Sequence, residues 1–134
     1  MSGNNVDVPF PCSPQIRIVN PENIEFDSDN LNNFQTFGNY YQAAAKISIG
    51  KGTYIAPNVG LITANHDFNN LNIWSEAKPI TIGEKCWIGM NTVVLPGVIL
   101  GNHTIVGAGS VVTKSFSEGN CIIAGNPAKL IRKI

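Results

Sequence analysis

The stretch that decides the fold runs from Ile82 to Phe116 and reads IGEKCWIGMNTVVLPGVILGNHTIVGAGSVVTKSF. An aliphatic residue returns in it at every sixth position, namely Ile82, Ile88, Val94, Leu100, Val106 and Val112. Four places after the first five of these stand Cys86, Thr92, Val98, Thr104 and Ser110. Neither a helix, with about 3.6 residues per turn, nor an alternating strand has a period of six. A triangular coil does, with each hexapeptide forming one flat side, so the stretch predicts an all-β parallel β-helix of hexapeptide repeats.

The same spacing continues toward the N-terminus with one interruption. Ile49, Ile55 and Leu61 keep the period, and extrapolation backward meets Ala43, Phe37 and Leu31. Leu61 and Ile82 lie 21 positions apart, which is three hexapeptides plus three residues, so the phase slips once. We therefore expect one protruding loop at about 66–79. Loops on a rigid scaffold often carry binding and catalytic residues.

The length bounds the domain organisation. A chain of 134 residues has room for one hydrophobic core, so we expect a single domain over 1–134. Within it, we expect an N-terminal cap over 1–30, coils over 31–117 and a C-terminal tail over 118–134. The cap and the tail would cover the two open ends of the stack, whose unpaired strand edges need protection.

Charge and cysteine content exclude several functions. Nine basic and nine acidic residues cancel, and no basic stripe favours nucleic acid. The first residues do not resemble a secretory signal, and no apolar run is long enough to span a membrane. Three widely separated cysteines suggest free thiols, so we expect a cytoplasmic protein.

Seven short motifs occur in an order that is typical of one family. They are Ile55-Ala56-Pro57-Asn58, Thr63-Ala64-Asn65-His66-Asp67, Pro79-Ile80-Thr81-Ile82-Gly83, Trp87-Ile88-Gly89, Leu95-Pro96-Gly97-Val98, Gly107-Ala108-Gly109-Ser110-Val111-Val112-Thr113-Lys114 and Ala124-Gly125-Asn126-Pro127-Ala128-Lys129. The chain thereby resembles the hexapeptide-repeat acyltransferases, and specifically the maltose/galactoside O-acetyltransferase-like branch that modifies sugars and surface polysaccharides. The resemblance implies a left-handed coil, a homotrimer with active sites between neighbouring subunits, and acetyl-CoA as co-substrate.

His66 is the candidate catalytic residue. It lies in the predicted loop, and the resemblance places the family's catalytic histidine at this position. Transfer of an acetyl group to a sugar hydroxyl needs a base that takes the hydroxyl proton during attack on the thioester, and a neutral imidazole suits this task. A backbone carbonyl or the adjacent Asp67 would orient the ring.

The resemblance also supplies a donor site. Positions that match the family's contacts with coenzyme A are Trp87, Met90, Ala108, Thr113, Lys114, Lys129 and Arg132. Trp87 would line the groove, and the backbone of Met90 and Ala108 would contact the thioester end and the pantetheine arm. The remaining four would lie around the adenosine phosphates, where cations form charge-assisted hydrogen bonds.

The acceptor site departs from the family pattern. The galactoside branch carries an Asn and an Asp before the catalytic loop, and the matching positions here are Gly38 and Ala44, which cannot bind a sugar hydroxyl. Asn39, Tyr40 and Asp67 are the candidate substrate-binding residues instead. We therefore expect an acceptor other than free galactosides or maltose, such as a polysaccharide precursor or a nucleotide-linked sugar.

His103 contrasts with His66. It stands three places after Leu100, at a turn where side chains normally face solvent, so we expect a surface role. The γ-class carbonic anhydrases share this type of coil but require three histidines, and this chain has two. No metal site is therefore expected.

The sequence thus favours an acetyl-CoA-dependent O-acetyltransferase that uses His66 as general base on a saccharide hydroxyl. Two alternatives stay open. An N-acetyltransferase of a nucleotide-linked amino sugar needs the same base and groove. A non-catalytic β-helix scaffold is disfavoured because His66, Lys114 and the groove motifs occur together.

Overall fold

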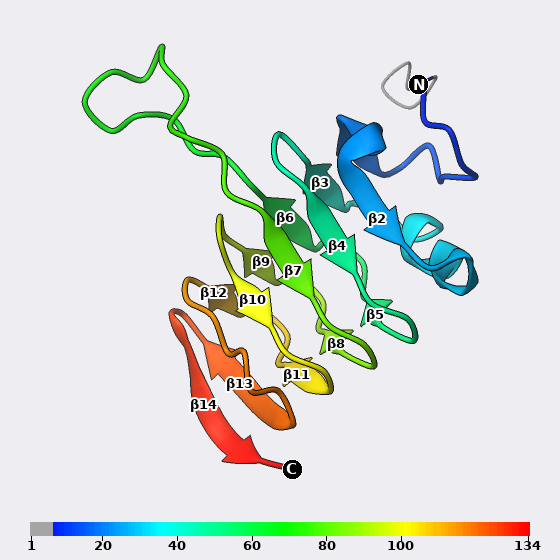
Figure 1. The fold of residues 1–134 in the computed structure, drawn as a ribbon, viewed down its shortest axis with the longest axis vertical. Coiled ribbons are helices and arrows are strands. Elements are labelled where there is room, and N and C mark those ends of the chain that lie inside the picture. The colour runs from blue at the N-terminus through cyan, green and yellow to red at the C-terminus, as the bar shows by residue number, and fades with distance from the viewer. Residues whose placement is uncertain (1–6) are drawn as a thin grey trace.

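The computed structural model describes residues 7–134, and its regular structure consists almost entirely of short strands. The strands form three ladders that run the length of a stack (Figure 1). Sheet A contains β1 (Arg17–Val19), β3 (Tyr40–Gln42), β6 (Gly60–Ile62), β9 (Val93–Val94) and β12 (Val111–Val112). Sheet B contains β2 (Ile24–Phe26), β4 (Ile47–Ile49), β7 (Ile80–Ile82) and β10 (Ile99–Leu100). Sheet C contains β5 (Tyr54–Ile55), β8 (Trp87–Ile88), β11 (Thr104–Val106), β13 (Cys121–Gly125) and β14 (Ala128–Lys133).

The chain visits sheets A, B and C in turn and then begins the next coil. Every strand pair within these sheets is parallel except β13 with β14. The expected all-β architecture of parallel hexapeptide coils is confirmed.

The six-residue period is the period of the core. The aliphatic positions Ile82, Ile88, Val94, Leu100, Val106 and Val112 are all at most 1% exposed. The positions four places after them, Cys86, Thr92, Val98, Thr104 and Ser110, are equally buried. Buried hydroxyls at these corners bond to the turn backbone, as Ser110 does to the Gly107 carbonyl at 2.6 Å. Burial of polar side chains at these corners therefore costs little free energy, because each hydroxyl keeps a hydrogen-bond partner.

Small residues after the aliphatic positions allow the coils to stack closely. A Cβ atom added to Gly50 would lie 2.4 Å from the backbone of Gly83 in the next coil. No side chain fits into that gap. The glycines of the repeat are thus required by the close approach of successive backbones.

The N-terminal coils differ from the expectation in extent and register. β1 and β2 already pair with β3 and β4, so parallel pairing starts at Arg17 and not at residue 31. Tyr41 pairs with Leu61, 20 positions later, where the strict period had placed Ala43. Phe37, which the extrapolated register had placed inside, is 48% exposed. The period fails here because Tyr41 and the rings packed beside it fill the end of the core in place of small aliphatic residues.

An aromatic cluster closes this end of the stack. Phe34 contacts Phe10, Phe26 and Tyr41, with ring centroids 4.7, 4.6 and 5.6 Å away. Phe34 and Tyr41 are fully buried. Part of the expected N-terminal cap, residues 1–6, lies outside the described residues.

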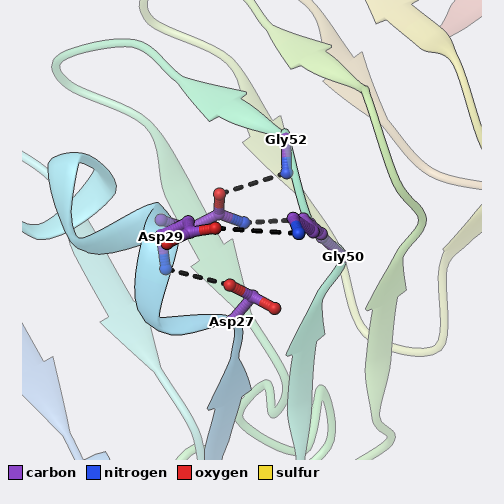
Figure 2. Close-up of polar contacts among 6 residues, drawn as sticks. Asp27, Asp29, Gly50 and Gly52 are labelled. Carbon is purple, nitrogen blue, oxygen red and sulfur yellow. Dashed lines mark hydrogen bonds and ion pairs between the residues drawn. The ribbon is translucent and has the colours of Figure 1, made fainter.

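The edge of sheet C at this end is covered by a short helix. A one-turn 3-10 helix, η2 (Pro21–Asn23), leads into β2, and η3 (Ser28–Phe34) occupies the third side of the first coil. Asn30 of η3 donates to the Gly50 carbonyl at 2.7 Å and accepts from the Gly52 N–H at 3.1 Å. Figure 2 labels Gly50 and Gly52, the residues at which these two contacts end.

Asn33 makes the same pair of contacts with the next stretch of backbone. Its amide donates to the Thr53 carbonyl at 2.9 Å and accepts from the Ile55 N–H at 2.8 Å. A side-chain amide has the donor and the acceptor of a peptide group. Two asparagines therefore take the place of a strand beside residues 50–55, which comprise the turn before β5 and β5 itself, and satisfy that backbone.

The C-terminal residues continue sheet C before they reverse. Cys121–Gly125 pairs in parallel with β11, so part of the expected 118–134 tail is a further strand of the coil. β14 then returns antiparallel on β13 and covers that edge.

Between β6 and β7 the chain leaves the stack as a long loop, which extends well away from the sheets (Figure 1). Within residues 7–134 no helix is long and apolar enough to cross a membrane.

Candidate active site

The loop over 63–79 is braced by its own backbone. His66 and Trp74 form an antiparallel bridge across it. On either side, the Asp67 N–H donates to the Ile73 carbonyl at 2.7 Å and the Ser75 N–H donates to the Asn65 carbonyl at 2.8 Å. The loop is therefore a narrow hairpin at its base, which fixes the position of His66.

Two groups of the loop orient the His66 ring. Its Nδ1 lies 2.9 Å from the Leu71 carbonyl oxygen, and its ring stacks on Trp74 with centroids 4.2 Å apart. A carbonyl only accepts, so Nδ1 carries the hydrogen and donates it. In the neutral ring, Nε2 then keeps the lone pair, which is the arrangement of a general base.

Asp67 has a different role from the one that its adjacency to His66 suggested. Its Oδ1 accepts from the Asn69 N–H at 2.8 Å and the Asn70 N–H at 3.1 Å. The carboxylate thus shapes the turn of the loop, and the Leu71 carbonyl orients the imidazole.

His66 faces a cavity of about 590 Å³ at the corner between sheets A and B. The residues that line it are Asn65, His66, Asp67, Phe68, Asn69, Ser75, Glu76, Lys78, Leu95, Pro96 and Thr113. The structure therefore brings three of the predicted site residues together: His66, Asp67 and Thr113. The following residue, Lys114, is exposed, and its Nζ lies 5.6 Å from the Phe116 ring centroid.

The other predicted donor residues lie elsewhere on the same chain. Trp87 lies on the outer surface of sheet C, where it pairs with Tyr54 and Ile105 and is 56% exposed. It lines a hollow of about 910 Å³ that shares no lining residue with the His66 cavity.

The remaining donor candidates also belong to sheet C or its corner with sheet A. Met90 and Ala108 stand in the turns that follow β8 and β11, and both are exposed. Lys129 and Arg132 are exposed on β14. One chain thus presents His66 and Thr113 on one surface, and Trp87, Met90, Ala108, Lys129 and Arg132 elsewhere.

The two acceptor candidates before the loop differ in access. Asn39 is 2% exposed, and its amide bonds to the Ala56 carbonyl, the Tyr41 hydroxyl and the Thr36 hydroxyl. These bonds use both amide hydrogens and engage the oxygen, and the residue is buried, so Asn39 is not part of the proposed acceptor site. Tyr40 is exposed on β3 and lines a cavity of about 400 Å³ beside Trp74.

His103 is exposed with a backbone φ of 57°, as expected for a turn residue. Among residues 7–134, no group of three or more His, Cys, Asp or Glu side chains could hold a metal ion.

Sequence reasoning allowed a backbone carbonyl as the group that orients His66, but it could not identify the carbonyl as that of Leu71, and it missed the stacking on Trp74. The Leu71 carbonyl carries no side-chain signal, since its position depends on the path of the loop. Trp74 lies within the predicted loop, but nothing in the sequence relates its ring to His66. Its stacking on a histidine eight positions earlier depends on the hairpin that brings them together.

Comparison with known proteins is consistent with this architecture. Residues 79–114 match the family model for bacterial transferase hexapeptide repeats (six repeats). The structure is similar to a galactoside acetyltransferase in complex with coenzyme A, with a TM-score of 0.81 and 33% identity over 93% of this chain and 62% of that one. It is also similar to a maltose O-acetyltransferase from Clostridium difficile 630, with a TM-score of 0.63 and 31% identity over 90% of this chain and 67% of that one. The chain belongs to the hexapeptide-repeat acyltransferase family.

This hexapeptide-repeat acyltransferase chain spans about half the length of the curated relatives that it matches. It is 45% identical over 93 residues to YJL218W of Saccharomyces cerevisiae, a match that covers 67% of this chain and 47% of that protein. The resemblance seen in the sequence is confirmed.

Proposed function

We propose that this chain is an acetyl-CoA-dependent O-acetyltransferase that acts on a hydroxyl of a sugar or polysaccharide precursor. The observation that carries the proposal is an exposed imidazole whose Nδ1 is held by the Leu71 carbonyl, which leaves Nε2 as the base. The similarity to a galactoside acetyltransferase bound to coenzyme A and to a maltose O-acetyltransferase supports the donor and the class of acceptor.

The proposed reaction is a direct transfer. The Nε2 of His66 takes the hydroxyl proton while the sugar oxygen attacks the thioester carbonyl carbon. The carbon–sulfur bond then breaks, and the departing thiolate of coenzyme A receives the proton from the imidazolium. The contact with Leu71 stays in place throughout, because Nδ1 donates in both protonation states.

The residues of the His66 cavity do not favour a covalent intermediate. Cysteine is absent from its lining, and Cys86 and Cys121 are buried elsewhere in the coil. The Ser75 hydroxyl donates to the Asn65 carbonyl at 2.9 Å and accepts from the Asn65 N–H at 3.3 Å. A nucleophilic serine would instead be bonded to the base.

The proposed assembly is a homotrimer of left-handed coils, as the family resemblance implies, and the separation of the predicted residues supports an active site shared between subunits. His66 lies at the corner of sheets A and B, and Trp87 lies on sheet C. A complete site then requires that one subunit supplies the histidine and its neighbour supplies Trp87. The outer surface of sheet C exposes Tyr54 and Trp87 on adjacent strands, at 65% and 56%, which suits a contact between subunits.

In the proposed trimer, the donor lies in the groove between two subunits. The backbone around Met90 and Ala108 would receive the pantetheine arm. Thr113 and the cations Lys114, Lys129 and Arg132 would hold the phosphates through charge-assisted hydrogen bonds.

Two measurements on the full chain test the proposal. Light scattering should give a mass of three chains of 14.4 kDa each. Release of coenzyme A should depend on a saccharide acceptor in a panel that contains both hydroxyl and amino sugars. A monomer without affinity for acetyl-CoA in calorimetry would contradict the proposal, and transfer to amines alone would move it to the N-acetyltransferase class.

A further inference from the structure

A second cavity lies against Trp74, on the outer surface of sheet A. Its volume is about 400 Å³, within the range of roughly 300–1,000 Å³ that small-molecule sites occupy. We call it the Arg17 pocket, and its lining is Arg17, Val19, Tyr40, Gln42, Ala44, Ala64, Trp74, Ser75 and Ala77. The first two coils supply its floor, and the loop that carries His66 supplies its wall.

The Arg17 pocket contains an unpaired positive charge. Arg17 is exposed on β1 and lies directly beside Tyr40 on β3. Within residues 7–134, the ion pairs involve Lys46, Lys51 and Lys133, and none involves Arg17. No Asp or Glu lines the pocket. Its electrostatic character is therefore cationic, although the whole chain is neutral.

The other polar groups of the pocket differ in their availability. The Gln42 amide is used inside the fold, where it accepts from the N–H groups of Thr63 and Ala64 at 3.0 and 2.9 Å. The Tyr40 hydroxyl and the Trp74 indole N–H have no hydrogen bond to residues 7–134 in the structure. Together with Arg17 they offer donors and two aromatic surfaces. Donors suit an anionic group, and aromatic surfaces suit a sugar ring.

The Arg17 pocket adjoins the His66 cavity. Ser75 lines both, and the Trp74 ring that lines the pocket also stacks on His66. A ligand that fills the pocket therefore lies next to the proposed base, separated from it by Trp74 and Ser75. An acceptor longer than one sugar ring would span both cavities.

The geometry points to an acidic saccharide as the acceptor: the Arg17 pocket binds its anionic group, and a neighbouring hydroxyl reaches His66. The shared chemistry is a carboxylate or phosphate on a sugar, which Arg17 binds through paired N–H donors. This inference rests on the proposed acetyltransferase function, because it names the acceptor of the same site. It also agrees with the absence of the Asn and Asp that hold neutral galactosides, whose positions are Gly38 and Ala44.

The test compares matched acceptors with Arg17→Gln, Arg17→Lys and Lys51→Gln proteins. Lys51→Gln removes the same charge from an exposed turn on another side of the coil. The acceptors are a neutral disaccharide, the same disaccharide with a uronic acid, and a sugar phosphate. Loss of a charge-assisted hydrogen bond at an exposed site should raise KM for the acidic acceptors about tenfold in Arg17→Gln. The kcat value, the KM for acetyl-CoA and the KM for the neutral disaccharide should stay within about twofold.

Arg17→Lys should recover part of the affinity, and Lys51→Gln should match the wild type. The acidic sugar that wild type prefers decides between carboxylate and phosphate. Equal use of neutral and acidic acceptors by wild type, or equal effects of Arg17→Gln and Lys51→Gln, would overturn the inference. Binding of the same sugars, followed by NMR without acetyl-CoA, separates the two proposals. Binding that depends on Arg17 in a protein that transfers no acetyl group would refute the acetyltransferase and keep the anion site.

Discussion

The Nδ1 atom of His66 lies 2.9 Å from the carbonyl oxygen of Leu71, five positions later in the same loop. The proposed base is therefore oriented by the backbone of its own loop and by the Trp74 ring stacked on it. Imidazoles in proteins are commonly held at one nitrogen in this way, which leaves the other free for proton transfer.

We expect His66→Ala to lower kcat by roughly 10²–10⁴, because the hydroxyl then lacks a positioned base. The affinity for acetyl-CoA should change little, since the ring is assigned no donor contact. Asn72→Ala is the matched control, because Asn72 is exposed in the same loop and does not line the His66 cavity. Steady-state kinetics with a circular dichroism check measure both. A folded His66→Ala protein that keeps more than about a tenth of wild-type turnover would contradict the assignment of His66 as the general base.

Lys114→Gln should raise KM for acetyl-CoA and leave the KM for the acceptor unchanged. A hydrogen bond to a charged group contributes about 1.5–3 kcal/mol, and exposure of Lys114 favours the low end, about tenfold. Lys46→Gln removes a charge of the same sign that forms a surface pair with Glu25 at 2.8 Å. Should both variants show the same KM for acetyl-CoA, Lys114 is ordinary surface charge.

Gly50→Ala should destabilise the coil strongly, because its Cβ would lie 2.4 Å from the Gly83 backbone. We expect a loss of at least about 2 kcal/mol in the free energy of unfolding, as for other overpacked sites. Gly60→Ala is the control, since its added Cβ meets only side-chain atoms at 3.9 Å. Urea unfolding should rank Gly60→Ala near the wild type, and equal stability of the two variants would contradict the close stacking of coils.

Asn33→Ala should lower the free energy of unfolding by about 2–6 kcal/mol. It leaves the Thr53 carbonyl and the Ile55 N–H without partners, and each buried unpaired group costs about 1–3 kcal/mol. Gln35→Ala, an exposed neighbour just after η3, should change stability by no more than about 0.5 kcal/mol. Thermal and urea unfolding compare the three proteins. An Asn33→Ala protein with the wild-type free energy of unfolding would show that the edge of β5 does not depend on the Asn33 amide.

Stability should decline in alkaline solution. Burial raises the pKa of the Tyr41 hydroxyl above its ordinary value of 10.0, and burial likewise raises the pKa of the Cys86 thiol above 9.0. The folded protein then holds protons that the unfolded chain releases, so the free energy of unfolding falls as pH rises above these ordinary values. For Tyr41 alone, the slope reaches about 1.4 kcal/mol per pH unit above about pH 10. Urea unfolding between pH 8 and 11 should show a shallower decline for Tyr41→Phe, and parallel declines would contradict the role of this hydroxyl.

The repeat determined the coil without help from the tertiary structure. Each hexapeptide places one aliphatic residue inward, so Ile82 through Val112 could be assigned to the core by counting alone. The phase slip between Leu61 and Ile82 likewise depends only on spacing. Periodicity can be read from the sequence alone, and it predicts which residues are buried wherever each coil has the same structure as the one before it.

Counting failed at the N-terminal end of the repeat. Tyr41 took the place expected for Ala43, and Asn30 and Asn33 covered the backbone of residues 50–55, because no further coil precedes the first one and this end must be closed by other side chains. The sequence indicated His66 through the family motif, yet the roles of Leu71, Trp74 and Arg17 depend on where the loop and the first coils lie in space. By itself the sequence determined the coil and the candidate base. The partners of that base and the cationic pocket beside it were decided by tertiary structure, because they join residues that no period relates.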